Sequence, residues 1–320
     1  MEVKMLEFPL NIGDQNLPPL SMALGYFDGV HRGHQQVIQK AKQQAIDKGL
    51  SSAVMTFDPH PSVVLKKGQK PIQYITPLTE KIKVIEHFGI DYLFIVHFTE
   101  EFANLLPQEF IDQYIIGLNV KHVTAGFDYS YGRMGKGNME TLPFHSREKF
   151  TYSVVPEFME GNQKVSSTRI RNLLKEGKID QIPSLLGRYY STSGIVIHGD
   201  KRGRTIGFPT ANIELNDDYI TPPVGVYAVR IKVNDVWHNG VCNVGYRPTF
   251  NKENVKISIE VYIFDFNQDI YGEETVVEWL LYLRNERKFS GIDELVKQIE
   301  KDKLNALQYF NENRQTSKKG

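Results

Sequence analysis

Cysteine is almost absent from this chain: its 320 residues contain one, Cys242. A single cysteine excludes an internal disulfide and is typical of proteins that fold in a reducing compartment. Cys242 stands in a strand-like apolar run. We therefore expect it to be a small buried side chain rather than a nucleophile.

A long apolar run and a surplus of charge are missing too. No stretch approaches the ~20 apolar residues of a membrane-spanning helix, and Glu2, Lys4 and Glu7 stand where a signal peptide would begin its apolar core. The 38 basic and 38 acidic residues cancel, whereas proteins that bind polyanions usually carry a basic excess. The sequence predicts a cytoplasmic protein with neither membrane nor nucleic acid as partner, and it leaves the oligomeric state open.

The chain does have two halves with different hydrophobic patterns, and it is long enough for two domains. In residues 1–186, apolar strand-like runs alternate with helical periods, which predicts a Rossmann-like α/β domain with a parallel, doubly wound sheet. In residues 187–310, short alternating runs predict a small antiparallel β-barrel or sandwich of five or six strands, followed by a C-terminal helix. Residues 311–320 form a polar tail.

Local signals predict where two of the helices lie. Thr76 and Pro77 fit the cap and the first position of a helix. The C-terminal helix is expected over residues 292–310. Its apolar face would consist of Ile292, Leu295 and Ile299.

The densest functional signal is A-L-G-Y-F-D-G-V-H-R-G-H, residues 23–34, between a short apolar strand and a helix that ends at Gly49. Unpaired N–H groups and the helix dipole favour a phosphate at such a junction, and His31 and His34 fall on one side of the first turn. Such junctions are ordinary in α/β proteins, and their histidines are often structural. The helix would bury Val37, Ile38, Ala41 and Ala45.

Two further loops are expected at the same edge of the sheet. T-F-D-P-H-P (residues 56–61) and G-F-D-Y-S-Y-G (residues 126–132) each follow a predicted strand, and ligands of parallel sheets bind beyond the carboxyl ends of the strands. Together with the first loop they predict one shared pocket. The basic segment at residues 133–137 is either a solvated surface loop or a mobile loop over phosphates.

A second element suited to phosphate is K-V-S-S-T-R-I-R, residues 164–171. Ser167 could simply cap the helix that begins here. Arg169 and Arg171, however, stand near the positive end of that helix, where an anion is already favoured.

The second half contains H-G-D-K-R-G-R-T-I-G-F-P-T-A-N-I, residues 198–213, in which Lys201 lies in a basic, glycine-rich loop. This loop is either a surface hairpin tip or a mobile loop for polyphosphate. Thr210 and Asn212 point the same way in an extended strand, and their oxygens can complete the shell of a hydrated Mg²⁺ on ATP. Glu260, further on, reads as an exposed strand glutamate.

These stretches resemble the signatures of bacterial-type bifunctional riboflavin kinase/FAD synthetase. The first, G-Y-F-D-G-V-H-R-G-H, is similar to the H-x-G-H signature of nucleotidylyltransferases, and K-V-S-S-T-R-I-R is similar to the loop that clamps ATP phosphates. P-T-A-N together with E-V-Y-I-F-D-F-N-Q-D-I-Y-G is similar to the riboflavin kinase signature. The resemblance extends from about Leu20 to Asp302 and departs from the family at Tyr262, where histidine is frequent.

The resemblance implies that residues 187–310 phosphorylate riboflavin to FMN with ATP and Mg²⁺, and that residues 1–186 adenylylate FMN to FAD with release of pyrophosphate. Glu260 would accept the proton of the attacking hydroxyl, and His31 and His34 would hydrogen-bond the phosphates of the transition state. The nucleotides would contact Gly25, Phe27, Asp28, Gly29, Gly33, Ser167, Thr168, Arg169, Gly203, Arg204, Gly207, Pro209, Thr210 and Asn212. The metal would be held by Thr210 and Asn212, and the flavin by Asp58, Asp128 and Arg287.

Two other interpretations remain at this point. A different small-molecule adenylyl- or cytidylyltransferase with a β-rich accessory domain would give Thr210, Asn212 and Glu260 no role. A nucleotide- or flavin-sensing regulator without catalysis would most naturally have lost His31, His34 or Glu260, and the chain keeps all three.

Overall fold

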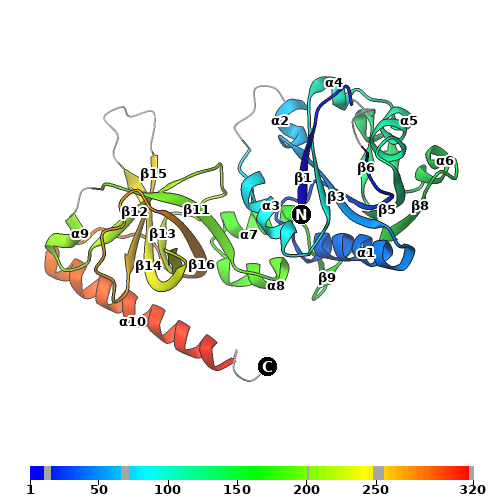
Figure 1. The fold of residues 1–320 in the computed structure, drawn as a ribbon. Coiled ribbons are helices and arrows are strands. Elements are labelled where there is room, and N and C mark those ends of the chain that lie inside the picture. Colours follow the sequence, from blue (N-terminus) through cyan, green and yellow to red (C-terminus); the bar gives the residue numbers. More distant parts are fainter. Residues whose placement is uncertain (11–15, 66–71, 200–201, 248–255, 317–320) are drawn as a thin grey trace. The chain divides into compact units, whose positions relative to one another are not determined.

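The computed structural model describes residues 1–10, 16–65, 72–199, 202–247 and 256–316. The chain divides into two compact units, Met1–Ser167 and Thr168–Gly320 (Figure 1). The boundary expected after residue 186 lies inside the second unit. It stays a prediction, because it describes where one function ends and the other begins, whereas the two units are defined by contacts within the chain. Lys201 lies outside the described residues.

The first unit is built on a sheet of six parallel strands in the order β1–β4–β3–β2–β5–β8. The strands are β1 (Glu2–Leu6), β2 (Leu20–Leu24), β3 (Ser51–Asp58), β4 (Tyr92–His97), β5 (Val120–Gly126) and β8 (Thr151–Val155). The central strands are buried along most of their length, and this is why they appear in the sequence as continuous apolar runs.

Helices cover both faces of this sheet, so the predicted doubly wound α/β domain is confirmed. One core contains residues of α1 (Arg32–Lys48) and α3 (Leu78–Glu86). The other contains residues of α5 (Pro107–Phe110) and of the π-helix η2 (Ile111–Ile116). Gly49 ends α1 in the left-handed conformation, which glycine adopts without strain. As predicted, α1 buries Val37, Ile38, Ala41 and Ala45.

Short elements complete the first unit. The basic segment at residues 133–137 forms a turn between two paired strands, β6 and β7. The short elements are α2 (Pro61–Leu65), α4 (Glu100–Ala103), β6 (Ser130–Tyr131), η3 (Arg133–Gly135), β7 (Gly137–Asn138), α6 (Leu142–Ser146), β9 (Met159–Glu160) and β10 (Gln163–Lys164).

The prediction that Thr76 caps α3 is wrong. Pro77 occupies the N-cap position, and no side chain caps the first turn. The backbone N–H of Thr76 donates instead to the Asp28 carboxylate at 3.0 Å, beside the N–H of Ile75 at 3.1 Å. A buried carboxylate 48 positions earlier in the chain therefore holds this segment, and no local signal could have indicated it.

The second unit is a closed antiparallel barrel with the strand order β11–β12–β15–β14–β13–β16. This result selects the barrel over the sandwich. The strands are β11 (Tyr190–Ile197), β12 (Thr210–Leu215), β13 (Gly225–Val233), β14 (Val236–Arg247), β15 (Lys256–Ile263) and β16 (Glu274–Arg284). The predicted hairpin turn between β13 and β14 is present, with positive φ angles at Asn234 and Asp235.

Four helical segments accompany these strands before the C-terminal helix. They are α7 (Ser167–Lys175), which begins at the boundary of the units, η4 (Ile179–Gln181), α8 (Ile182–Leu186) and α9 (Arg202–Thr205). The last of them occupies part of the glycine-rich loop that the sequence predicted.

Helix α10 (Ile292–Thr316) lies along the outside of the barrel, against β13, β14 and β16 (Figure 1). It runs past the predicted end at residue 310, and residues 317–320 lie outside the described part. Its predicted apolar face is right only in part: Leu295 and Ile299 are half-buried, but Ile292 is 65% exposed, and the buried positions are Asp302, Ala306 and Phe310. The sequence did not indicate that one of these buried positions is a carboxylate.

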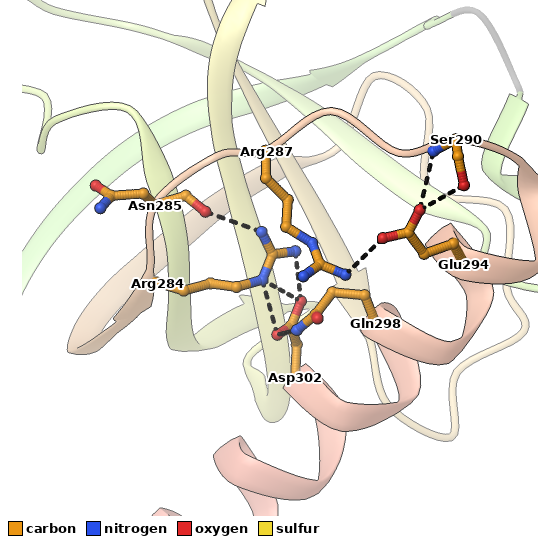
Figure 2. Close-up of polar contacts among 7 residues, drawn as sticks. All are labelled: Arg284, Asn285, Arg287, Ser290, Glu294, Gln298 and Asp302. Atoms are coloured by element: carbon orange, nitrogen blue, oxygen red, sulfur yellow. Dashed lines mark hydrogen bonds and ion pairs between the residues drawn. The ribbon is translucent and has the colours of Figure 1, made fainter.

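Asp302 is buried because Arg284, at the end of β16, neutralises it. The guanidinium donates from Nε and Nη2 to both carboxylate oxygens over 2.7–3.0 Å, and the Gln298 amide donates a further hydrogen bond (Figure 2). Removing either charge would leave the other buried without compensation. The pair therefore fixes how α10 sits on the barrel.

Cys242 is fully buried and free, as predicted, and burial raises the pKa of its thiol. It is therefore a packing residue rather than a nucleophile. Among the described helices, none is both long enough and apolar enough to cross a membrane.

Candidate functional sites

The loop between β2 and α1 carries the two histidines on a tightly anchored backbone. Phe27 and Val30 both have positive φ angles, and both side chains are buried in the core under α1. Residues with such side chains rarely adopt this conformation unless the surroundings impose it. The loop thus has one well-defined shape, which presents the N-terminus of α1.

His31 and His34 lie face to face at that N-terminus, with ring centroids 3.5 Å apart and ring planes at 17°. His31 is the N-cap of α1, and its Nδ1 accepts a hydrogen bond from the His34 backbone N–H at 3.2 Å. In a neutral imidazole this leaves the proton on Nε2. The cap therefore gives His31 a second ring nitrogen that can donate to an anion.

His34 is set up differently. Burial, with the neighbouring charges of His31 and Lys81, holds its pKa well below the ordinary value of 6.5, so the ring is neutral at neutral pH. Its Nδ1 is buried and has no hydrogen-bond partner among the described residues. A buried ring nitrogen without a partner is costly.

The three glycines of this loop stand where a larger side chain would meet a neighbouring group or a strained backbone. A side chain at Gly25 would press on the Phe27 ring at 2.7 Å, and one at Gly33 would approach the His31 ring at 3.2 Å. Gly29 has a φ angle of +87°, which favours glycine. Larger residues here would displace the groups that shape the junction.

Two other predicted nucleotide contacts hold the loop in place. The Asp28 carboxylate accepts the N–H groups at the start of α3, and the Asp28 carbonyl accepts the Ser167 hydroxyl at 2.9 Å. Ser167 is the first residue of α7, and its hydroxyl bonds to the first loop. Thr168 and Arg169 follow at the start of the second unit, the first exposed and the second half-buried.

A cavity of about 740 Å³ opens at the carboxyl end of the sheet. Its walls come from the segments after β2, β3, β4 and β5, including Tyr26, Phe57, Phe102 and Tyr129. The cavity joins the two later predicted loops with Tyr26 of the histidine loop, whereas His31 and His34 are not among its lining residues. Its mostly apolar, aromatic lining suits a flat ring system.

The two carboxylates proposed for the flavin do not line this cavity themselves. Asp58 and Asp128 are the chain neighbours of two lining residues, Phe57 and Tyr129. Asp128 forms an exposed ion pair with Lys164 at 2.6 Å. Their contact with flavin stays a prediction.

Sequence reasoning missed Lys81, which is 1% exposed and donates a hydrogen bond to the Tyr26 carbonyl in the histidine loop. It belongs to the apolar stripe of α3, at helical spacing from Leu78 and Ile85. A lysine on the buried face of an amphipathic helix is itself a signal, and it could have been noticed.

In the barrel, Glu260 stands between two asparagines. It lies directly opposite Asn212 on β12 and Asn243 on β14. Residues directly opposite in antiparallel strands point to the same face, so the half-buried Glu260 has an amide on each side. The pairing with Asn243 was not predicted, because it depends on the register between β14 and β15.

The glycine-rich loop borders a second cavity of about 450 Å³, lined by Arg204, Pro209 and Thr210 and by residues 266–271. The space beside β12 exists because residues 199 and 203 are glycines. A side chain at Gly199 would collide with the Asn212 amide, and one at Gly203 would collide with the backbone carbonyl of Phe208. Gly207 has a φ angle of +87°, which favours glycine.

Arg287 lies in the segment between β16 and α10, where it pairs with Glu294 at 3.3 Å (Figure 2). It also stacks on the Phe289 ring. Neither cavity is lined by it. Its contact with flavin stays a prediction.

Two family models match the chain, one described as FAD synthetase over residues 14–169 and one described as riboflavin kinase over residues 186–310. The chain is 56% identical over 290 residues to the bifunctional riboflavin kinase/FMN adenylyltransferase of Bacillus subtilis (strain 168), which covers 90% of this chain and 92% of the relative. It is 36% identical over 292 residues to the protein of the same name from Escherichia coli (strain K12), with the same coverage. The crystal structure of a protein named macrolide-efflux protein, from Streptococcus pneumoniae, is similar with a TM-score of 0.86 and 35% identity, over 95% of this chain and 98% of that one.

Proposed function

The chain belongs to the family of bifunctional riboflavin kinase/FMN adenylyltransferases, and we propose that it makes FAD from riboflavin in two ATP-dependent steps with one site in each half. Riboflavin is phosphorylated to FMN, and FMN is adenylylated to FAD with release of pyrophosphate. The observation that carries this proposal is the match over 90% of the chain to a relative that is 56% identical and named for both activities. The streptococcal protein of similar structure bears a name that refers to a different function.

The adenylylation site comprises the paired histidines and the cavity of about 740 Å³. The flavin ring binds in the aromatic cavity, and the FMN phosphate points toward the N-terminus of α1. A phosphate oxygen of FMN attacks the α-phosphorus of ATP in line, and the bond to pyrophosphate breaks. No covalent protein intermediate is needed, because positioning and charge stabilisation are sufficient.

The histidines stabilise the charge that develops on the phosphate oxygens. His31 donates from Nε2, since its Nδ1 is occupied by the cap, and neutral His34 adds a second ring. The helix dipole of α1 acts in the same direction. Arg169, which belongs to the K-V-S-S-T-R-I-R segment, is proposed to bind the ATP phosphates.

The kinase site comprises Glu260 and its two flanking asparagines. Glu260 orients the ribityl 5′-hydroxyl of riboflavin and accepts its proton as the oxygen attacks the γ-phosphorus of ATP, whose bond to the departing ADP breaks. ATP occupies the cavity beside Thr210, with the glycine-rich loop over its phosphates.

Mg²⁺ is proposed as the metal of this site, held by Thr210 and Asn212. Both residues point to the same face of β12, and the glycine at 199 leaves room for the Asn212 amide. A hydroxyl and an amide oxygen are neutral ligands, which suits an ion that keeps several waters and binds mainly to ATP phosphates. When bound, Mg²⁺ neutralises charge on the transferred phosphoryl group.

The proposal is tested by incubating the purified protein with riboflavin, ATP and Mg²⁺ and separating the flavins by chromatography. FMN should form first and FAD should follow. Absence of both products would refute the proposed function. A cytoplasmic location and a functional boundary after residue 186 stay predictions that this assay does not address.

A further inference from the structure

The buried Lys81 has no role in the chemistry described so far. Its Nζ donates to the Tyr26 carbonyl at 3.0 Å and to the Thr56 hydroxyl at 3.4 Å. It also lies 4.2 Å from the centroid of the Tyr26 ring. Among the described residues, no carboxylate is within ion-pair distance of it.

Burial lowers the pKa of the Lys81 ammonium group to about 8, against the opposing effect of the more distant Asp28 and Asp58 carboxylates. Burying a charged ammonium group without a carboxylate partner costs free energy of folding. We therefore expect Lys81 to have a function that offsets this cost.

The residue that Lys81 holds connects the two parts of the adenylylation site. Tyr26 lines the cavity of about 740 Å³, and it also belongs to the loop that leads to His31. Its ring packs edge-on against His60, with centroids 4.3 Å apart. A shift of Tyr26 would therefore alter the flavin pocket and the approach to the phosphate site together.

Thr56 binds the same carbonyl group of Tyr26 as Lys81 does. Its hydroxyl donates to the Tyr26 carbonyl at 2.8 Å, so this single oxygen accepts hydrogen bonds from Thr56 and from Lys81. Thr56 lies on β3 and Lys81 on α3, so two separate elements fix one carbonyl of the loop. Such a double attachment limits the movement of the peptide far more than one hydrogen bond would.

We propose that Lys81 is a positioning residue for FMN adenylylation, which holds Tyr26 so that the flavin pocket and the histidine loop keep a productive arrangement. Its positive charge would also favour anionic phosphates at the histidine loop. This inference rests on the proposed function. It gives a buried lysine outside the three sequence signatures a direct effect on one of the two reactions.

The test compares Lys81→Met with Lys83→Met in the full-length protein. Lys83 lies on the same helix, but it is exposed and pairs with Glu80, so its replacement removes the same charge without touching the site. We expect Lys81→Met to lower kcat/KM for FMN adenylylation by roughly 10- to 100-fold, since small displacements of reacting groups cost this much. Lys83→Met should stay within about twofold of the wild type, and riboflavin phosphorylation should be unchanged in both.

Two further variants separate positioning from a general loss of structure. Lys81→Arg keeps a positive charge and hydrogen-bond donors, and it should retain more adenylylation activity than Lys81→Met. Thr56→Val removes the other donor to the Tyr26 carbonyl at similar volume and should cause a smaller loss. If both groups act on Tyr26, the double variant should lose less than the product of the single losses, because the two changes remove one shared function.

The outcomes distinguish this inference from the proposed function. A wild-type protein that makes no FAD would refute the proposed function itself. An active wild type whose folded Lys81→Met variant keeps normal kcat/KM would overturn the role of Lys81. Independent, multiplicative losses in Lys81→Met and Thr56→Val would overturn it as well. If Lys81→Met fails to fold, Thr56→Val decides alone, and unchanged adenylylation in that variant counts against the proposal.

Discussion

Asn212 and Glu260 lie directly opposite each other on neighbouring strands of the barrel, so the proposed metal ligand and the proposed base share one face. They are 48 positions apart in the chain, and only the pairing of β12 with β15 brings them together. This arrangement puts the proposed base beside a proposed ligand of the metal.

Glu260→Gln tests that arrangement. The amide keeps the shape of the side chain but cannot accept the hydroxyl proton, so riboflavin phosphorylation should fall by about 10²- to 10⁴-fold. FMN adenylylation should remain near the wild-type rate. Initial rates of FMN formation from riboflavin, and of FAD formation from supplied FMN, give both values. Glu214→Gln is the matched control, because Glu214 is exposed on the neighbouring strand β12. Normal phosphorylation in Glu260→Gln would show that another group is the base.

The pH dependence of adenylylation reports on His34. Burial and the nearby His31 and Lys81 charges hold its pKa well below 6.5, so the neutral ring persists into moderately acidic solution. We expect the acidic limb of kcat/KM for FMN to have its midpoint below pH 6.5, measured from about pH 5 to 8. Removing the Lys81 charge in Lys81→Met should move that midpoint upward. A wild-type midpoint at or above 6.5 would contradict a neutral, buried His34.

The stability of the first unit should depend on pH through His122. This ring is buried between the Thr151 and Ser153 hydroxyls at 2.7 and 3.0 Å. Burial, with Lys48 and Lys40, lowers its pKa from 6.5 to about 4. Between these two values the unfolded chain gains a proton that the folded chain does not, so the free energy of unfolding falls as the pH falls. The loss is at most about 3 kcal/mol.

Urea denaturation at pH 7 and pH 5, followed by circular dichroism, measures this effect. Both tryptophans, Trp237 and Trp279, belong to the second unit, so fluorescence separates its transition from that of the first. His122→Gln should weaken the pH dependence, whereas the exposed His97→Gln should not. Equal pH dependence in His122→Gln and the wild type would rule out this role for His122.

The pair of Asp302 and Arg284 should stabilise the barrel unit (Figure 2). Asp302→Ala leaves a guanidinium without its buried partner and should lower the free energy of unfolding by about 3–5 kcal/mol. Tryptophan fluorescence during urea denaturation measures it, since Trp279 is buried in the barrel. Glu294→Ala, which removes the exposed partner of Arg287, should change the free energy of unfolding much less. Similar small losses in both variants would show that the buried pair does not fix α10.

The sequence allowed prediction of whatever depends on local patterns. The buried face of α1, its end at Gly49 and the Asn234–Asp235 turn follow from residues close in the chain. The errors arose where a distant residue decided the outcome. Asp28 binds the backbone before α3, and Arg284 allows a carboxylate on the buried face of α10.

The candidate sites divide in the same way. The glycines and histidines of the first loop are contiguous, so their association at one helix N-terminus could be predicted. The neighbours of Glu260 on β12 and β14, and the contact of Lys81 with Tyr26, depend on strand register and helix packing. Contacts between residues far apart in the chain produce no hydrophobic period or local motif, so a single sequence does not reveal them.

The division of labour between the two halves is tested most directly by a mixing experiment. His31→Ala with His34→Ala should convert riboflavin to FMN and stop there, because the groups that stabilise the adenylylation transition state are gone. Glu260→Gln should convert FMN to FAD but should leave riboflavin unchanged. Mixed with riboflavin, ATP and Mg²⁺, the two variants together should make FAD, quantified by chromatography. If either variant, correctly folded, has lost both activities, the assignment of one reaction to each site is contradicted.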